Sequence, residues 1–88
     1  MAATKNDISM WFDEGIEKKA THMIVVCDTF DYEDYPCYAN GDADVLEKYD
    51  GFNGKNMQQV MEVYDLRDDK TQQMNTHRAM RLPQTTNK

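Results

Sequence analysis

Cysteine, long apolar runs and basic residues are all scarce in this chain, and each scarcity excludes a class of protein. Only two cysteines, Cys27 and Cys37, occur in 88 residues, too few for a disulfide scaffold, so we expect a reduced, cytoplasmic setting. No apolar run approaches the roughly 18 residues of a membrane span, and the N-terminal residues lack the apolar stretch of a secretory signal. We therefore expect no association with a membrane.

Basic residues are outnumbered by acidic ones. Lys and Arg number 10 against 16 Asp and Glu, which gives a net charge of -6 at pH 7. Because nucleic-acid binders gain most of their affinity from Lys and Arg on phosphates, we expect no direct contact with DNA or RNA. Residues 28–50 hold eight acids and one base, whereas residues 66–88 hold five bases and two acids. This asymmetry predicts an acidic face that docks on a basic partner, or else a solvated surface that keeps a small protein in solution.

Length and composition predict a single small domain. The chain is 40% hydrophobic and 30% charged, inside the globular range and outside the disordered one. At this size the core is small, so independent folding is expected with little margin. Residues 1–4 and 83–88 are expected to be frayed tails.

The first regular element is an amphipathic helix over residues 5–19. Ile8, Phe12 and Ile16 follow the spacing of one helix face, and Trp11 is expected to anchor the core beside them. Thr4, with Asp7 three residues later, has the pattern of a capping box.

Two strands joined by a hairpin are expected next. Residues 22–29 contain a continuous, β-branched apolar run, which is typical of a central strand covered on both faces. An acidic and aromatic loop over residues 30–36 leads to a short second strand at residues 37–39. A hairpin centred on Tyr32 would bring the two cysteines roughly opposite each other. We expect buried structural thiols, with a cross-strand disulfide or a reactive thiol as alternatives.

A second helix and a third strand follow. Asp44, with Glu47 three residues on, predicts a capped helix that stops at Asp50–Gly51. Residues 58–64 alternate and predict a strand. One side of that strand would carry Gln59, Met61 and Val63, and the other Val60, Glu62 and Tyr64.

A last helix is expected from Asp65 to about Met80. Its apolar stripe is thin and consists of Leu66, Met74, His77 and Met80. Its basic residues, which form a second candidate contact surface, are Arg67, Lys70, Arg78 and Arg81. Few buried contacts predict that residues 67–82 open more readily than the sheet, unless the stripe completes the core.

The element order is therefore α-β-β-α-β-α. A right-handed crossover puts the third strand beside the first, which gives strand order 2-1-3 with antiparallel neighbours. This order sets the most apolar strand in the middle. We expect an α+β fold in which three helices pack on a three-stranded antiparallel sheet.

Few residues of the sequence are spaced as catalytic residues or metal ligands are. Clustered carboxylates within Asp28–Asp34 would suit Ca²⁺ or Mg²⁺, but their spacing does not match an EF-hand loop. His22 and His77 lie far apart in the sequence, and no Ser or Cys near either suggests a nucleophile with its base. We expect no catalytic residue, no metal ligand and no cofactor. The alternative is a small metal-binding protein or metal-dependent enzyme that uses the carboxylates of residues 28–34.

The same segment is better suited to recognition. Its candidate contact residues are Asp31, Tyr32, Glu33, Asp34 and Tyr35. Tyrosines amid charges offer rigid amphipathic anchors with a charged rim, a composition common at protein interfaces. The alternative is a solvated hairpin loop whose tyrosines fold back on the sheet.

Two blocks of sequence resemble a known group. Asp28–Pro36 (DTFDYEDYP) and Asn56–Leu66 (NMQQVMEVYDL) resemble two signatures of a family of small uncharacterised proteins encoded by tailed phages and prophages. The resemblance covers most of residues 10–80 and implies a phage gene product in the cytoplasm of a bacterial host. From the resemblance we expect an aliphatic residue at the position of Cys37, which implies an incidental rather than a catalytic thiol.

Source and size together imply a binding role. Small acidic phage proteins often inhibit host machinery or host defence by binding it, so the resemblance implies a non-enzymatic protein with a protein partner. We expect it to be a monomer or a weak homodimer.

Overall fold

The structure, a computed structural model, describes residues 4–54, 57–76 and 79–82. Its elements are α1 (Lys5–Glu17), β1 (His22–Asp28), β2 (Glu33–Ala39), α2 (Asp42–Phe52), β3 (Gln58–Asp65) and α3 (Lys70–Met74). The three strands form an antiparallel sheet in the order β2-β1-β3. The predicted α+β fold, its element order and its strand order are confirmed.

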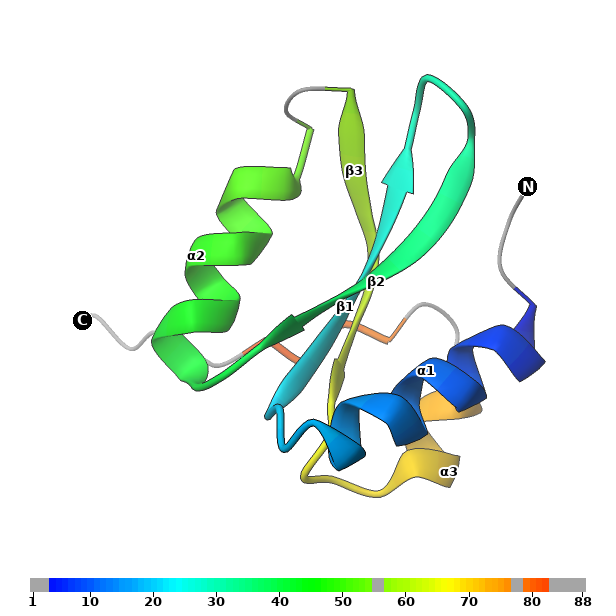
Figure 1. Ribbon diagram of the computed structural model, residues 1–88, viewed down its shortest axis with the longest axis vertical. Coiled ribbons are helices and arrows are strands. Elements are labelled where there is room, and N and C mark those ends of the chain that lie inside the picture. The colour runs from blue at the N-terminus through cyan, green and yellow to red at the C-terminus, as the bar shows by residue number, and fades with distance from the viewer. Residues whose placement is uncertain (1–3, 55–56, 77–78, 83–88) are drawn as a thin grey trace.

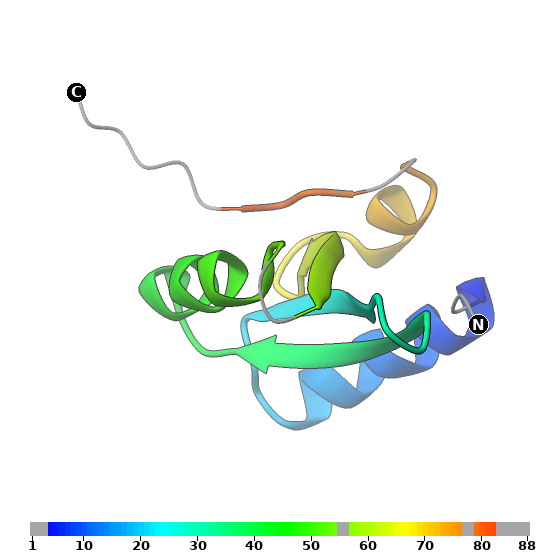
Figure 2. The same cartoon turned by 90° about the horizontal axis from the view of Figure 1, so that it is seen from above.

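Two helices cover opposite faces of the sheet, so the molecule has two small cores (Figures 1 and 2). The core under α1 holds Ile8, Phe12, Met23, Val25, Tyr64, Leu66 and Ala79. The core under α2 holds Ile24, Val26, Ala39, Val45, Val60 and Val63. Since successive side chains of a strand point to opposite faces, β1 serves both cores, and its residues 22–26 are all buried. Among the described residues, no helix combines the length and apolarity needed to cross a membrane.

Helix α1 has the predicted capping box. Thr4 Oγ1 accepts from the Asp7 amide at 3.2 Å, and Asp7 Oδ2 accepts from the Thr4 amide at 3.1 Å. Thr4, which we assigned to the N-terminal tail, is therefore the N-cap, while residues 1–3 and 83–88 lie outside the described residues. The helix ends at Glu17, and Ile16 is 49% exposed because the buried face runs along Ile8, Phe12 and Gly15. Trp11 is partly buried against the same core.

The hairpin differs from the prediction in its centre. β2 begins at Glu33 rather than at residue 37, so Cys27 pairs with Asp34 and Cys37 pairs with Ile24. Cys37 packs on the α2 side, whereas Cys27, one position beyond Val26 of the α2-side core, faces the α1 side. The predicted opposition of the two cysteines is wrong, and both are free thiols. Pro36 lies in an edge strand, where its missing N–H is tolerated.

Helix α2 begins earlier and ends later than predicted. Its N-cap is Gly41, which has φ 105° and no side chain, so the predicted cap by Asp44 and Glu47 is wrong. Asp44 instead lies in the first turn, where its carboxylate accepts from the Asn40 amide at 2.8 Å and from Lys48 Nζ at 3.0 Å. The helix continues through Gly51, because a single glycine weakens a helix without stopping it.

Strand β3 contains a bulge that changes its side-chain phase. Val25 pairs with Glu62 while Val26 pairs with Val60, so Met61 is the extra residue. Val60 and Val63 consequently share the α2-side core, although strict alternation assigned them to opposite sides. Met61 packs with Tyr64 against the α1-side core.

The predicted helix from Asp65 to Met80 is wrong. Among the described residues of that range only Lys70–Met74 is helical, with Asp69 as its N-cap, and Met80 forms a parallel bridge with Val63 of β3. The Val63 amide donates to the Ala79 carbonyl and the Arg81 amide donates to the Val63 carbonyl, both at 2.9 Å. The edge of β3 would otherwise expose unpaired backbone groups, which explains why the chain returns to it. His77, a member of the predicted stripe, lies outside the described residues.

Gln73 fixes the turn between β3 and α3. Its side chain is fully buried, with Oε1 accepting from the Asp65 amide at 2.8 Å. Its Nε2 donates to the carbonyl groups of Asp65 at 2.8 Å and Asp69 at 3.1 Å. These three bonds satisfy both ends of the buried amide and tie the end of β3 to the start of α3.

Gly15→Ala is expected to destabilise the protein, although alanine favours a helix. The added Cβ would lie 2.6 Å from Leu66 Cδ1 and 2.7 Å from Tyr38 Cε1, against a ring that is held by its hydroxyl bond to the Trp11 carbonyl. Overpacking of about 3 kcal/mol exceeds the gain of about 1 kcal/mol in helix propensity. Urea unfolding measures the difference.

Gly51→Ala is the matched control, because its Cβ would meet no atom within 4 Å. It should raise the free energy of unfolding by up to about 1 kcal/mol. Equal changes for the two variants would contradict the close approach of α1 to β2.

Candidate functional site

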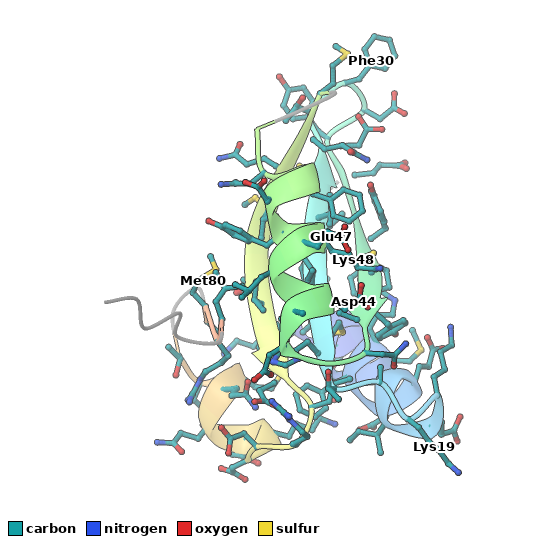
Figure 3. The ribbon with its side chains drawn as sticks, turned by 90° about the vertical axis from the view of Figure 1, so that its left-hand side faces the viewer. Lys19, Phe30, Asp44, Glu47, Lys48 and Met80 are labelled. Atoms are coloured by element: carbon teal, nitrogen blue, oxygen red, sulfur yellow. The ribbon has the colours of Figure 1, made fainter. Side chains whose placement is uncertain are left out.

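The first candidate site is the end of the molecule where β1 turns into β2. We call this surface the hairpin end; it comprises Asp28, Phe30, Asp31, Tyr32, Glu33, Asp34 and Met57. Asp28 organises the turn, with its Oδ1 accepting from the Phe30 amide at 2.9 Å and its carbonyl from the Tyr32 amide at 2.6 Å. The Thr29 amide donates to the Met57 carbonyl at 2.8 Å, which joins the start of β3 to the hairpin. Figure 3 shows Phe30 at the extreme tip of the molecule.

Three large apolar side chains are exposed at the hairpin end. Phe30 is 71% exposed, Tyr32 70% and Met57 60%. Tyr32 and Met57 also have positive φ angles of 58° and 59°, a left-handed conformation that costs about 1 kcal/mol or more for a side chain other than glycine. Glycine would adopt both conformations freely. Tyr32 and Met57 are therefore unfavourable for folding in two ways: their apolar side chains stay in water, and their backbone conformation is strained.

The five predicted contact residues do not form one surface. Asp31, Tyr32 and Glu33 are exposed at the hairpin end. Asp34 reaches the α1 side of the sheet, where burial and then the Asp34 carboxylate raise the pKa of the Cys27 thiol. Tyr35 turns to the α2 side, where its hydroxyl accepts from Gln58 Nε2 and burial raises the pKa of the phenol. Tyr35 therefore packs on the sheet, as the alternative interpretation of the tyrosines stated.

Sequence reasoning missed the apolar component of this surface. Phe30 and Met57 belong to the two blocks of the family resemblance, but the candidate contact residues included neither. Their exposure depends on the turn conformation and on the pairing of residues 29 and 57, which no local pattern reveals.

The metal alternative finds no matching geometry in the part of the chain that the structure describes. No group of three or more His, Cys, Asp or Glu side chains there is close enough to hold an ion. The carboxylates of residues 28–34 diverge because the pleat of β2 sends Glu33 and Asp34 to opposite faces.

The described bases of the second predicted contact surface each lie beside a carboxylate. Lys70 Nζ lies 2.9 Å from Asp13 Oδ1, and Arg81 lies 3.8 Å from Asp68. Arg67 bonds Asp65 through Nε at 3.0 Å and through a terminal nitrogen at 3.1 Å, and that nitrogen is 3.3 Å from Asp42. Arg78, the remaining member, lies outside the described residues. Because the predicted helix does not form, the described bases do not follow one helix face: Arg67 and Arg81 line the same cleft, whereas Lys70 contacts Asp13 of α1.

A polar cleft of about 230 Å³ lies at the opposite end of the sheet and was not predicted. It is lined by His22, Asp42, Asp65, Arg67, Asp68, Arg81 and Leu82. His22 is 1% exposed, with Nδ1 2.8 Å from Thr21 Oγ1 and Nε2 3.8 Å from Asp65 Oδ2. The antiparallel register pairs His22 with Asp65, which we predicted at the start of the last helix rather than in β3.

Thr21, His22 and Asp65 thus align a hydroxyl, an imidazole and a carboxylate, as a nucleophilic triad does. The Thr21 hydroxyl, however, accepts from the Gly41 amide at 2.7 Å and lies 3.2 Å from the Ala39 carbonyl, so it serves the backbone where β2 turns into α2. Asp65 is likewise held by Arg67. We interpret the cleft as a structural network that joins β1, β2, β3 and α2.

Electrostatics agree with that interpretation. Burial lowers the pKa of His22, and Arg67 lowers it further, against the opposing effects of Asp65 and Asp42. Burial alone would raise the pKa of Asp65, but the hydrogen bonds from Arg67 outweigh it and hold that pKa below its usual range. The folded state therefore favours neutral His22 beside ionised Asp65.

Comparisons with known proteins add no relative. No protein family, no curated protein and no solved structure matches the chain.

Stability is expected to fall as the pH is lowered from 7 through 6.5. His22 in the unfolded chain takes up its proton near pH 6.5, whereas the folded state takes it up only at lower pH, so the unfolded state binds more protons in between. Urea unfolding between pH 5 and pH 8 and the imidazole NMR signal of His22 measure the effect.

An imidazole that titrates at or above pH 6.5 in the folded protein would contradict this reading of the cleft. The signal is identified by its absence in His22→Asn, and His77→Asn separates the second histidine.

Proposed function

We propose that this protein is a non-enzymatic binding protein that docks on a positively charged protein partner through its hairpin end. The observation that carries the proposal is the separation of paired and unpaired charge along the sheet. Arg67 and Arg81 at the cleft, and Lys70 on α3, are each beside a carboxylate. At the hairpin end Asp31 and Glu33 are exposed, and no cation within residues 4–54, 57–76 and 79–82 forms an ion pair with either.

Such an end attracts a basic partner at long range. Carboxylates on a protruding surface, with no ion pair to any described cation, raise the association rate with a cationic protein, and they suppress binding to nucleic acid and to anionic lipid. The bases Arg67, Lys70 and Arg81 are neutralised by neighbouring carboxylates, so they attract a charged partner less strongly. We therefore propose a protein partner, with no direct contact to nucleic acid or membrane.

The resemblance to phage and prophage proteins supports a biological setting for this role. It suggests action in the cytoplasm of a bacterial host, on host machinery or a host defence complex, or on another phage protein. We propose that the protein acts as a monomer or a weak homodimer, since two copies meeting at their hairpin ends would bring like charges together.

Neutralising the hairpin end should weaken partner capture. The variant Asp31→Asn with Glu33→Gln removes two charges from exposed side chains, so the fold should persist. Pull-down from bacterial lysate, followed by kinetics on the captured partner, should show a slower association and about a tenfold weaker affinity at low salt.

The matched control is Glu14→Gln with Glu17→Gln, which removes the same charge from exposed positions on α1. Equal binding by the wild type and the hairpin-end variant would reject the proposed role of the acidic surface. An equal loss in both variants would show a dependence on net charge alone.

A further inference from the structure

The exposed apolar side chains of the hairpin end require an explanation that charge does not supply. Phe30, Tyr32 and Met57 are half of the large exposed hydrophobic residues in the described chain. The remaining three, Met10, Ile16 and Met80, lie elsewhere, on α1 and on the segment 79–82. Scattered apolar residues are ordinary on a protein surface, whereas a group at one protruding end marks an interaction site.

Backbone bonds hold the group together. The bond from the Thr29 amide to the Met57 carbonyl connects the two chain segments that carry these side chains. Asp28 accepts from the amides of Phe30 and Tyr32 and so fixes the turn between them. The side chains are therefore displayed from a braced turn rather than from a loose loop, which reduces the entropy lost on binding.

The residue types match the anchors of protein interfaces. Phe and Tyr offer large rigid surfaces, and Met adapts its shape to the pocket that receives it. Asp31 and Glu33, which flank Tyr32 in the sequence, are exposed, and the Asp28 carboxylate accepts from the Phe30 amide. An apolar centre inside a charged rim is the usual anatomy of a binding hot spot.

We propose that Phe30, Tyr32 and Met57 form an apolar anchor that inserts into a hydrophobic pocket framed by Lys or Arg on a partner protein. This inference rests on the proposed function and adds the chemistry of the partner. The carboxylate rim selects against an anionic membrane, and it selects against a second copy of the same hairpin end by like-charge repulsion. A cationic peptide segment with apolar side chains is the minimal occupant.

A random-peptide display library panned on the wild-type protein tests the chemistry of the partner directly. Counter-selection uses the anchor variant, Phe30→Gln with Met57→Gln, whose exposed side chains contribute to neither core. We expect enriched peptides that combine Lys or Arg with Leu or aromatic residues. Enrichment of acidic or purely polar peptides, or no enrichment that depends on the anchor, would overturn the proposal.

Affinities of one enriched peptide then separate the two proposals. The anchor variant should weaken binding by about tenfold or more, while the control Met10→Gln with Ile16→Gln stays within about twofold. If the charge variant Asp31→Asn with Glu33→Gln weakens binding and the anchor variant does not, the anchor is wrong and the acidic surface stands. If neither weakens binding, both are wrong. The wild type should not bind vesicles of phosphatidylcholine and phosphatidylglycerol. If it binds them and the anchor variant does not, the proposal of a protein partner is wrong.

Discussion

Burial of β1 on both of its faces determines how the other elements are arranged. Four consecutive apolar residues, Met23 to Val26, alternate between the α1-side and α2-side cores, so each face of the sheet needs a helix. A strand with two covered faces also needs a neighbour on each edge, which β2 and β3 supply. The connection from β2 to β3 must cross one face, and α2 is that connection. A polar substitution in this run would leave an unpaired group beside one of two small cores.

The same constraint separates the two ends of the sheet by chemistry. At the start of β1, His22 meets the ends of β2 and β3. Its ring lies between the Thr21 hydroxyl and the Asp65 carboxylate, and that carboxylate pairs with Arg67. At the far end of β1 the chain reverses through a short turn, where Phe30 and Tyr32 are largely exposed. Paired polar groups thus occupy the end of the sheet at the cleft, and exposed apolar and acidic groups occupy the hairpin end.

Local patterns were sufficient for the features that are decided locally. The β-branched run identified the central strand, and Thr4 with Asp7 identified the start of α1, because each signal lies within a few residues. The bulge at Met61 was not predicted, because it depends on Val60 and Val63 packing under the same helix. The short α3 and the contact of residues 79–82 with β3 were not predicted. Pairing with the edge of β3 competes with helix formation, and this long-range competition cannot be seen in a local stretch of sequence. The acidic character of the hairpin end was predictable from composition, whereas the inward turn of Tyr35 followed from β2 starting at Glu33.

Departures from ordinary folding preferences are concentrated at the hairpin end. Tyr32 and Met57 adopt left-handed backbone angles with large exposed side chains, and Asp31 and Glu33 carry charge that no described cation balances. The third left-handed residue other than glycine among the described residues, Lys19, directly follows the C-cap of α1, where helices commonly end in this conformation. The buried Gln73 amide is fully bonded, and no buried side-chain nitrogen or oxygen among the described residues lacks a partner. Residues that oppose local stability on an otherwise consistent fold are the expected mark of selection for function. Since these residues belong to neither core, they can be selected for binding without loss of the packing that holds the sheet.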